Sequence, residues 1–129
     1  VQTGDPNMLT TEGKVFLDEQ LELRRLAMEG PAIFLGHCAC DALKNQKGVI
    51  KVFIHSEDEE EVKNRITKDY GIAPEEVEST RRFYNKKRAG YFRANTGNDW
   101  KDLKNYDVVL DSAKLGIEGC VNVLKGIFE

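Results

Sequence analysis

Three short apolar segments alternate with stretches of helical periodicity, and this order constrains the fold more than any other feature of the sequence. The segments are AIFL at residues 32–35, VIKVFIHS at 49–56 and YDVVLDS at 106–112. Apolar runs of this length are typical of strands buried on both faces, and strands that alternate with helices usually pair in parallel. We therefore predict an α/β fold with a largely parallel sheet.

The stretches outside these segments are predicted to be mostly helical. Apolar side chains recur with roughly helical spacing from about residue 10, and Gly30 ends this first helix. A polar helical turn is predicted at residues 40–48. The last helix is predicted at residues 115–128.

Two further helices are predicted between the second and third strands. Ser56 is predicted to cap the first of them, because the acidic residues 58–61 follow in its first turn, where the helix dipole favours negative charge. Gly71 ends this helix. Pro74 lies near the first turn of the second helix, which extends toward Arg93.

The composition describes an ordinary globular protein. The chain has 129 residues, 40% of them hydrophobic and 32% charged, which suits one domain over residues 1–129. No apolar run is long enough to span a membrane, and the polar N-terminus is no secretory signal. Three cysteines, an odd number, argue for a reducing, cytoplasmic location. The formal net charge of -3 argues against general nucleic-acid binding.

Positive charge is concentrated in one part of this acidic chain. Between Arg81 and Lys104 there are eight Lys or Arg residues and only two acidic ones, Asp99 and Asp102. Composition alone favours a solvated helix face that is balanced by the acidic residues 57–78. The spacing of the positive charges supports a second interpretation.

The spacing places these side chains together on one side of the predicted helix. Arg81, Asn85 and Arg88 follow each other at intervals of four and three residues and therefore share one face. Arg82 and Lys86, also four residues apart, form a neighbouring pair. Two guanidinium groups on one face can hold phosphate oxygens through bidentate hydrogen bonds, so the pattern predicts a phosphate site.

The segment after the first predicted strand suggests other kinds of site. His37, Cys38 and Cys40 lie close together in sequence. A structural zinc site usually has a Cys-x2-Cys spacing and a second ligand pair, for which only the distant His55 and Cys120 remain. A hydrolase built on Cys38 and His37 lacks a nucleophile-elbow pattern. We therefore expect no metal site, and His37 stays a candidate ligand contact because it follows a strand.

Two polar segments follow the basic helix. Residues 96–107 are expected to form a surface connection in which Trp100 is an anchored aromatic residue. Asp111 and Ser112 follow the third predicted strand, which is where ligands gather in open parallel sheets. They are candidates for a loop adjacent to a nucleotide, although helix capping alone would also explain them.

The quoted segments resemble a known family. Residues 85–124 are similar to the C-terminal half of the cytidylate kinase-like family of P-loop kinases, which has a basic RA-x-Y-[YF] segment, then TG-x-x-W, then YD-x-x-L-[ND]-[ST]-x-x-LGI-x-G. Residues 30–43 resemble the family's strand that ends in Gly-Arg-Cys-Ala-Asp, and residues 49–56 resemble its next strand. The resemblance extends over residues 16–124.

The resemblance implies a fold and a reaction. The fold would be a P-loop kinase-like three-layer sandwich around a parallel sheet, with residues 72–104 as a mobile lid over the phosphates. The reaction would transfer a phosphoryl group from ATP, accompanied by Mg²⁺, to a nucleoside monophosphate of the cytidylate kind. The expected partner is therefore a small-molecule nucleotide.

The resemblance also implies roles for the basic residues. The lid of cytidylate kinases carries Arg, then Asp, then Arg at the positions of Arg81, Asn85 and Arg88. Arg81 and Arg88 are therefore the expected catalytic residues, because phosphoryl transfer depends on charge neutralisation. Arg82 and Lys86 are expected to bind phosphate, and Asn85 to position the acceptor.

Three residues depart from the family's pattern. Asn85 and Cys40 each replace an Asp, and His37 replaces the Arg that is expected to hold the acceptor's phosphate. A neutral His is a poorer phosphate ligand than Arg, although a nearby phosphate favours its protonated form. These departures favour an alternative function, a non-catalytic nucleotide- or phosphate-binding protein. A structural fragment with an inert basic surface is a third hypothesis.

The Walker A loop, G-x4-GK-[ST], has no match in the sequence. In the fold that the resemblance implies, the strand before this loop lies in the middle of the sheet, and a gap there would leave unpaired backbone groups in the core. We therefore expect residues 1–129 to form an incomplete kinase-like domain. It would be completed by an N-terminal segment of about 60 or more residues, or by another copy in a homo-oligomer through strand exchange.

Overall fold

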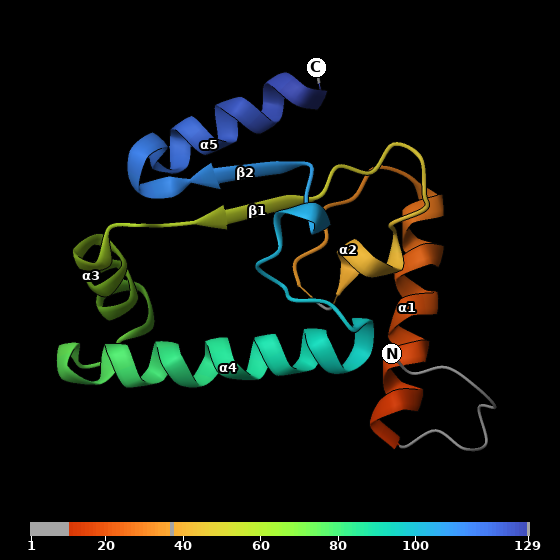
Figure 1. The fold of residues 1–129 in the computed structure, drawn as a ribbon. Helices are drawn as coiled ribbons and strands as arrows, with labels where there is room; N and C mark the ends of the chain where they lie inside the picture. The colour runs from red at the N-terminus through yellow and green to blue at the C-terminus, as the bar shows by residue number, and fades with distance from the viewer. Residues whose placement is uncertain (1–10, 37, 129) are drawn as a thin grey trace.

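The computed structural model describes residues 11–36 and 38–128 of the chain (Figure 1). The elements follow in the order α1 (Thr11–Glu29), α2 (Ala39–Ala42), β1 (Val52–His55), α3 (Glu59–Tyr70), the 3₁₀ turn η2 (Pro74–Glu76), α4 (Val77–Thr96), the 3₁₀ turn η3 (Leu103–Asn105), β2 (Val108–Asp111) and α5 (Ser112–Phe128). The described part is therefore a mostly helical α/β structure. No helix in it is long and apolar enough to cross a membrane.

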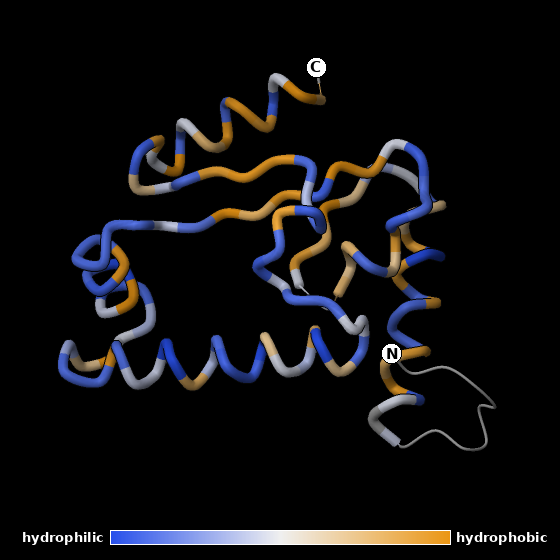
Figure 2. The backbone as a smooth tube through the Cα atoms, in the orientation of Figure 1, coloured by the Kyte–Doolittle hydropathy of each residue, from blue (hydrophilic) through white to orange (hydrophobic). Residues whose placement is uncertain are grey.

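The sheet formed by the described residues consists of two parallel strands. β1 pairs with β2 in a register that runs from Val52 opposite Val108 to His55 opposite Asp111. Figure 1 shows α5 alongside β2, with α3 and α4 beyond the other strand. Figure 2 shows hydrophobic residues along both strands and α5, whereas α3 and much of α4 are hydrophilic. The predicted parallel pairing is confirmed for the second and third predicted strands.

The prediction of a strand at residues 32–35 is wrong. This segment pairs with neither β1 nor β2, and Ile33 and Leu35 are 91% and 84% exposed. An apolar run becomes a strand only where a neighbouring strand takes up its backbone hydrogen bonds, and the part of the chain described here offers none. The described residues therefore do not form the predicted three-layer sandwich.

The ends of α3 and α4 follow the predicted chemistry with one change. Asp58, not Ser56, caps α3, because its carboxylate accepts a hydrogen bond from the backbone N–H of Glu61 at 3.1 Å. The Ser56 hydroxyl instead donates to the Glu61 carboxylate at 3.1 Å. Gly71 ends α3 and Gly97 ends α4 with φ of 65° and 76°, a conformation that glycine adopts without strain.

Helices α4 and α5 differ slightly from the predicted ranges. α4 continues past Arg93 to Thr96, and the turn η2, which begins at Pro74, leads into it. α5 begins at Ser112, before the predicted start at residue 115, but Gly116 has non-helical angles, with φ of 69° and ψ of 166°. The kink therefore separates the first turn of α5 from the rest of the helix.

A small core fixes the position of α4. Phe16 of α1, Cys38 and Phe92 of α4 are each at most 8% exposed and form one cluster, against which Trp100 packs. Val77, the first residue of α4, is 2% exposed. Both ends of α4 are therefore held by buried apolar side chains, while its basic middle stays at the surface.

Candidate functional site

An open groove of about 890 Å³, which we call the basic groove, runs along one face of α4. Four of the predicted site residues lie in it, one predicted to be catalytic (Arg81) and three predicted to bind substrate or phosphate (Arg82, Asn85 and Lys86), because helical spacing brings positions one turn apart to the same surface. The residues that line the basic groove are Glu59, Glu78, Arg81, Arg82, Asn85, Lys86, Ala89, Asp99, Trp100 and Lys101.

The loop after α4 forms the opposite wall of the basic groove. In this loop the Asp99 carboxylate accepts a hydrogen bond from the backbone N–H of Lys101 at 3.0 Å. The side-chain amide of Asn105 donates to the Asp99 carbonyl at 2.7 Å. These bonds fix the conformation of the loop, and Trp100 and Lys101 line the groove from it.

Carboxylates already neutralise part of the positive charge in the basic groove. The Arg81 guanidinium pairs with Glu59 of α3 at 2.5 Å and with Glu78 at 3.6 Å. Arg82 pairs with Glu78 at 3.5 Å. Lys86 makes no ion pair with any residue that the structure describes. Lys101, on the other wall, likewise makes no ion pair within the part of the chain that the structure describes. A bound anion would therefore meet the ammonium groups of Lys86 and Lys101 and two guanidinium groups that can exchange their carboxylates for it.

Arg88, the other residue predicted to be catalytic, lies beside the basic groove rather than among its lining residues. Its guanidinium carbon is 5.1 Å from the centroid of the Trp100 ring. The Lys101 ammonium nitrogen is 5.5 Å from the same centroid. Trp100 is thus in contact with two cations, one from α4 and one from its own loop.

The other predicted ligand residues do not reach the basic groove. The Asp111 carboxylate accepts a hydrogen bond from the backbone N–H of Ala113 at 2.9 Å. The Ser112 hydroxyl donates to the His55 carbonyl at 3.2 Å. Asp111 therefore accepts from the first turn of α5, as the capping interpretation predicts, whereas Ser112 bonds to the backbone of β1 and caps no helix. His37 lies outside the described residues.

The described side chains do not fit a metal site built by the protein. Cys38, Cys40 and Cys120 are free thiols. Within residues 11–36 and 38–128, no three His, Cys, Asp or Glu side chains gather in a way that could hold a metal ion. A Mg²⁺ ion that accompanies ATP would therefore need ligands from elsewhere.

We expect Cys38 to be unreactive in the folded protein. Burial raises the pKa of its thiol to about 12, with the charges of Asp41 and Cys40 adding to the effect. The nucleophilic thiolate is therefore scarce at pH 8. Because the pKa is higher in the folded than in the unfolded chain, the protonated thiol contributes to the free energy of unfolding below about pH 8.5, and this contribution is lost as the pH rises toward 12. Mass spectrometry should show that iodoacetamide modifies Cys38 far more slowly in native than in urea-unfolded protein. Equal rates would contradict this burial.

Some residues of the basic groove have no signal in the helical spacing. Glu59 is 22 positions from Arg81 in sequence, and its acidic character predicts only a favourable helix N-terminus. Asp99 and Lys101 belong to a loop whose path is set by its own hydrogen bonds. The one feature of the sequence that could have indicated this wall of the groove is Trp100, an aromatic residue in a segment rich in Lys and Arg.

The fold has a counterpart among solved structures. A crystal structure of an uncharacterized protein from Eubacterium ventriosum ATCC 27560 matches with a TM-score of 0.81 and 16% sequence identity, over 91% of this chain and 73% of that chain. At this identity the likeness shows the fold alone. A comparison with curated proteins found no match.

A comparison with protein families confirms the resemblance that the sequence motifs predicted. The cytidylate kinase-like family matches residues 5–114. This range includes α3, the whole of α4 and the loop with residues 99–101, and therefore every segment that lines the basic groove. The chain belongs to the cytidylate kinase-like family.

Proposed function

We propose that the basic groove binds the phosphate of a nucleoside monophosphate, and that the full-length protein transfers a phosphoryl group to this acceptor from ATP. One observation carries the proposal: Arg81, Arg82, Asn85 and Lys86 line one groove, with Lys101 on its other wall. On a chain with a net charge of -3, this local surplus of cations favours an anionic ligand. Membership of the cytidylate kinase-like family supports phosphoryl transfer as the reaction.

The residues of α4 suit the needs of phosphoryl transfer, which are positioning and neutralisation of charge. In the proposed roles, Arg81 and Arg88 neutralise the charge on the transferring group, because planar guanidinium groups form bidentate hydrogen bonds with phosphate. Arg82 and Lys86 hold the phosphate of the acceptor. Asn85, which is half-buried between these cations, positions the acceptor through its amide.

Binding in this proposal exchanges one anion for another at Arg81. The side chains of Glu59 and Glu78 are 71% and 67% exposed, so they can return to water when phosphate replaces them. A phosphate dianion carries more charge and more acceptor oxygens than a carboxylate. The exchange therefore favours phosphate, and it loosens the contact between α3 and α4 that the Glu59–Arg81 pair makes.

The donor side of the reaction must come from outside the described groove. The sequence has no Walker A loop, and the described side chains do not fit a metal site. Mg²⁺ bound with ATP would supply neutralising charge to the donor phosphates. We propose that the residues which complete the fold also supply this donor site, and His37 stays a predicted contact of the acceptor phosphate.

A further strand along the free edge of β1 would complete the fold. Among the described residues β1 has a single neighbour, β2, so its other edge leaves backbone N–H and C=O groups unpaired. Ile54 of β1 and the segment with Ile33 and Leu35 expose large apolar side chains. The similar solved chain is covered over 73% of its length, so it contains further residues that this chain does not match. The strand would come from the same protein, or from a second copy by exchange.

Dye binding and sedimentation test this completion. We expect the 129-residue chain to bind anilinonaphthalene sulfonate or to self-associate, because its apolar surface is uncovered. The full-length protein should bind little dye. A monomeric 129-residue chain that binds no dye would contradict the proposal.

An ATP-consumption screen over nucleoside monophosphates, with the full-length protein, tests the proposed reaction. We expect turnover with at least one acceptor and a large loss of rate in Arg88→Ala. No turnover with any acceptor, together with no effect of Arg88→Ala, would contradict it.

A non-catalytic nucleotide-binding protein is the second candidate, favoured by the departures at His37, Cys40 and Asn85. It predicts that a nucleotide raises the melting temperature, because the ligand binds the native state, while no ATP is consumed. A melting temperature that no phosphate compound changes would instead support the third hypothesis, an inert basic surface.

A further inference from the structure

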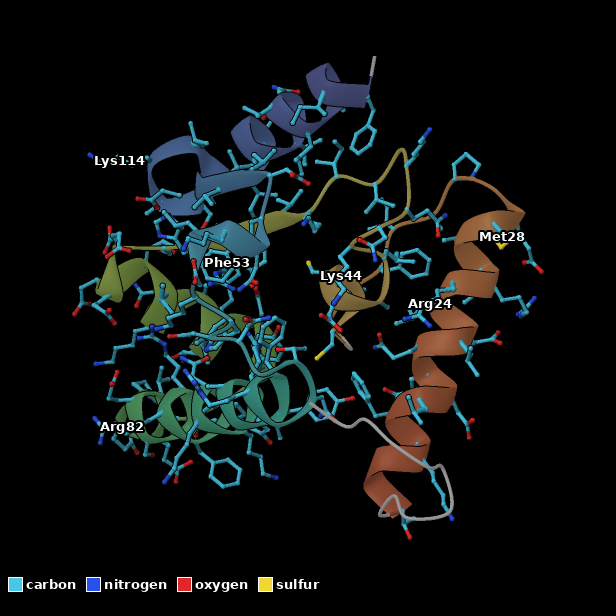
Figure 3. The ribbon with its side chains drawn as sticks, turned by 45° about the vertical axis from the view of Figure 1, so that its right-hand side comes forward. Arg24, Met28, Lys44, Phe53, Arg82 and Lys114 are labelled. Carbon is cyan, nitrogen blue, oxygen red and sulfur yellow. The ribbon has the colours of Figure 1, made fainter. Side chains whose placement is uncertain are left out.

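A single indole ring connects the basic face of α4 with the sheet. Phe53 of β1 contacts the Trp100 ring edge-on, with centroids 5.5 Å apart and an interplanar angle of 72°. The Tyr106 hydroxyl donates a hydrogen bond to the Trp100 carbonyl, and the Tyr106 ring lies 4.9 Å from that of Phe53. Figure 3 labels Phe53, which lies between the strands and α4. These contacts fix the ring from the side of the sheet.

The ring contacts Arg88 of α4. The guanidinium carbon lies 5.1 Å from the ring centroid, within the distance of about 6 Å at which a cation is attracted to an aromatic face. The charge of Arg88 also acts on Tyr106. Burial raises the pKa of the Tyr106 hydroxyl to about 12 and Cys40 adds to this rise, whereas the positive charge of Arg88 lowers the pKa. Arg88 therefore contacts an aromatic residue that is itself packed against β1.

We propose that Trp100 is the positioning residue for Arg88 in phosphate binding. A guanidinium held over an aromatic ring by cation–π attraction donates no hydrogen bond to a carboxylate, so its N–H donors stay available for phosphate oxygens. An Arg side chain that is free in solution loses much rotamer entropy when a ligand orders it. Trp100 removes part of that cost before the ligand arrives. This inference rests on the proposed binding of phosphate in the basic groove.

The neighbouring acidic residue explains why a positioning residue is needed. Asp99 lines the same end of the basic groove as Trp100. Among the described residues Arg88 makes no ion pair, and its contact is with the ring instead. Because the ring holds Arg88 without an ion pair, its full charge stays available to an incoming anion.

A double-mutant cycle on the full chain, with pyrophosphate as the ligand in a calorimetric titration, tests the inference. We expect Trp100→Leu to weaken binding about threefold, as loss of one cation–π contact implies, and Arg88→Ala to weaken it about tenfold. The double variant should bind no more weakly than Arg88→Ala alone, because each change removes the same interaction. Trp100→Phe, which keeps an aromatic face, should stay within about twofold of the wild type.

Fluorescence gives a second readout that a merely structural role would not produce. Trp100 is the single tryptophan of the chain, so all tryptophan emission comes from this ring. Because Lys101 also contacts the ring, the comparison is made in Lys101→Ala: pyrophosphate should change the emission of this variant, but not that of Lys101→Ala combined with Arg88→Ala, at concentrations that saturate the remaining cations.

The outcomes separate the two proposals. Two outcomes would overturn the role of Trp100 and leave phosphate binding intact: losses that multiply when Trp100→Leu and Arg88→Ala are combined, or an emission change that survives Arg88→Ala in the Lys101→Ala background. No heat of binding with the wild type would overturn phosphate binding itself, and the role of Trp100 with it.

Discussion

Alanine in place of both Arg81 and Arg82 is expected to weaken the binding of pyrophosphate about 100-fold. Each guanidinium can form charge-assisted hydrogen bonds, which contribute about 1.5–3 kcal/mol each. Part of this gain offsets the loss of the ion pairs with Glu59 and Glu78, so the net effect of both changes is about 3 kcal/mol. Calorimetric titration at fixed, low ionic strength measures it, because the contribution of exposed charges falls with salt.

A matched variant separates local contacts from total charge. Lys114 and Lys125 lie on α5, both are exposed, and neither lines the basic groove. Figure 3 labels Lys114 on α5, in the upper part of the view, and Arg82 on α4, in the lower part. Replacing both lysines with alanine removes two positive charges, as many as the arginine variant loses. If this variant bound pyrophosphate as weakly as the arginine variant, the net charge, and not the groove, would determine binding.

Phe92→Ala is expected to lower the free energy of unfolding by about 3–5 kcal/mol, which is a large part of the stability of a single domain. Phe92 belongs to the small buried cluster with Phe16 and Cys38, and Trp100 packs against it. Truncation leaves a cavity that these neighbours fill only in part. Urea denaturation of the full chain, followed by far-ultraviolet circular dichroism, measures the change.

Phe83→Ala is the matched control, because it makes the same substitution on the same helix at an exposed position. Phe83 is 55% exposed and contacts only Tyr84 and Lys87 among the ring and cation contacts described. We expect this variant to lose less than about 1 kcal/mol. Comparable losses for the two variants would contradict the assignment of the core to the Phe92 side of α4.

The basic face of α4 could be predicted from the sequence because helical spacing is a local property. Arg81, Asn85 and Lys86 needed only the period of the helix to come together on one surface. Gly71 was predicted as the end of α3 for the same reason, since a cap depends on residues within one turn. Ser56 and Asp58 both have side chains that can cap the N-terminus of α3. The residue that does so depends on where the helix begins after the strand, and this is not a local property of the sequence.

The wrong prediction and the contacts that the sequence did not predict all depend on residues far apart in the chain. The apolar run at residues 32–35 has the composition of a strand, but its pairing partner must come from another part of the fold. The ion pair between Glu59 and Arg81 joins two helices, and the contact between Trp100 and Phe53 joins a loop to a strand. Hydrophobic periodicity contains no information on these contacts, which only the folded arrangement creates.

Two adjacent lysines on α4 allow the most direct test of the central claim, that the basic groove is a phosphate site. Lys86 lines the groove, whereas Lys87 lies outside it with its ammonium nitrogen 4.8 Å from the centroid of the Phe83 ring. Because each replaces one lysine with alanine, Lys86→Ala and Lys87→Ala have the same net charge and composition and differ only in the position of the lost charge. In calorimetric titrations with cytidine monophosphate, we predict about tenfold weaker binding for Lys86→Ala and a change within about twofold for Lys87→Ala. Equal affinities of the two variants would contradict the claim.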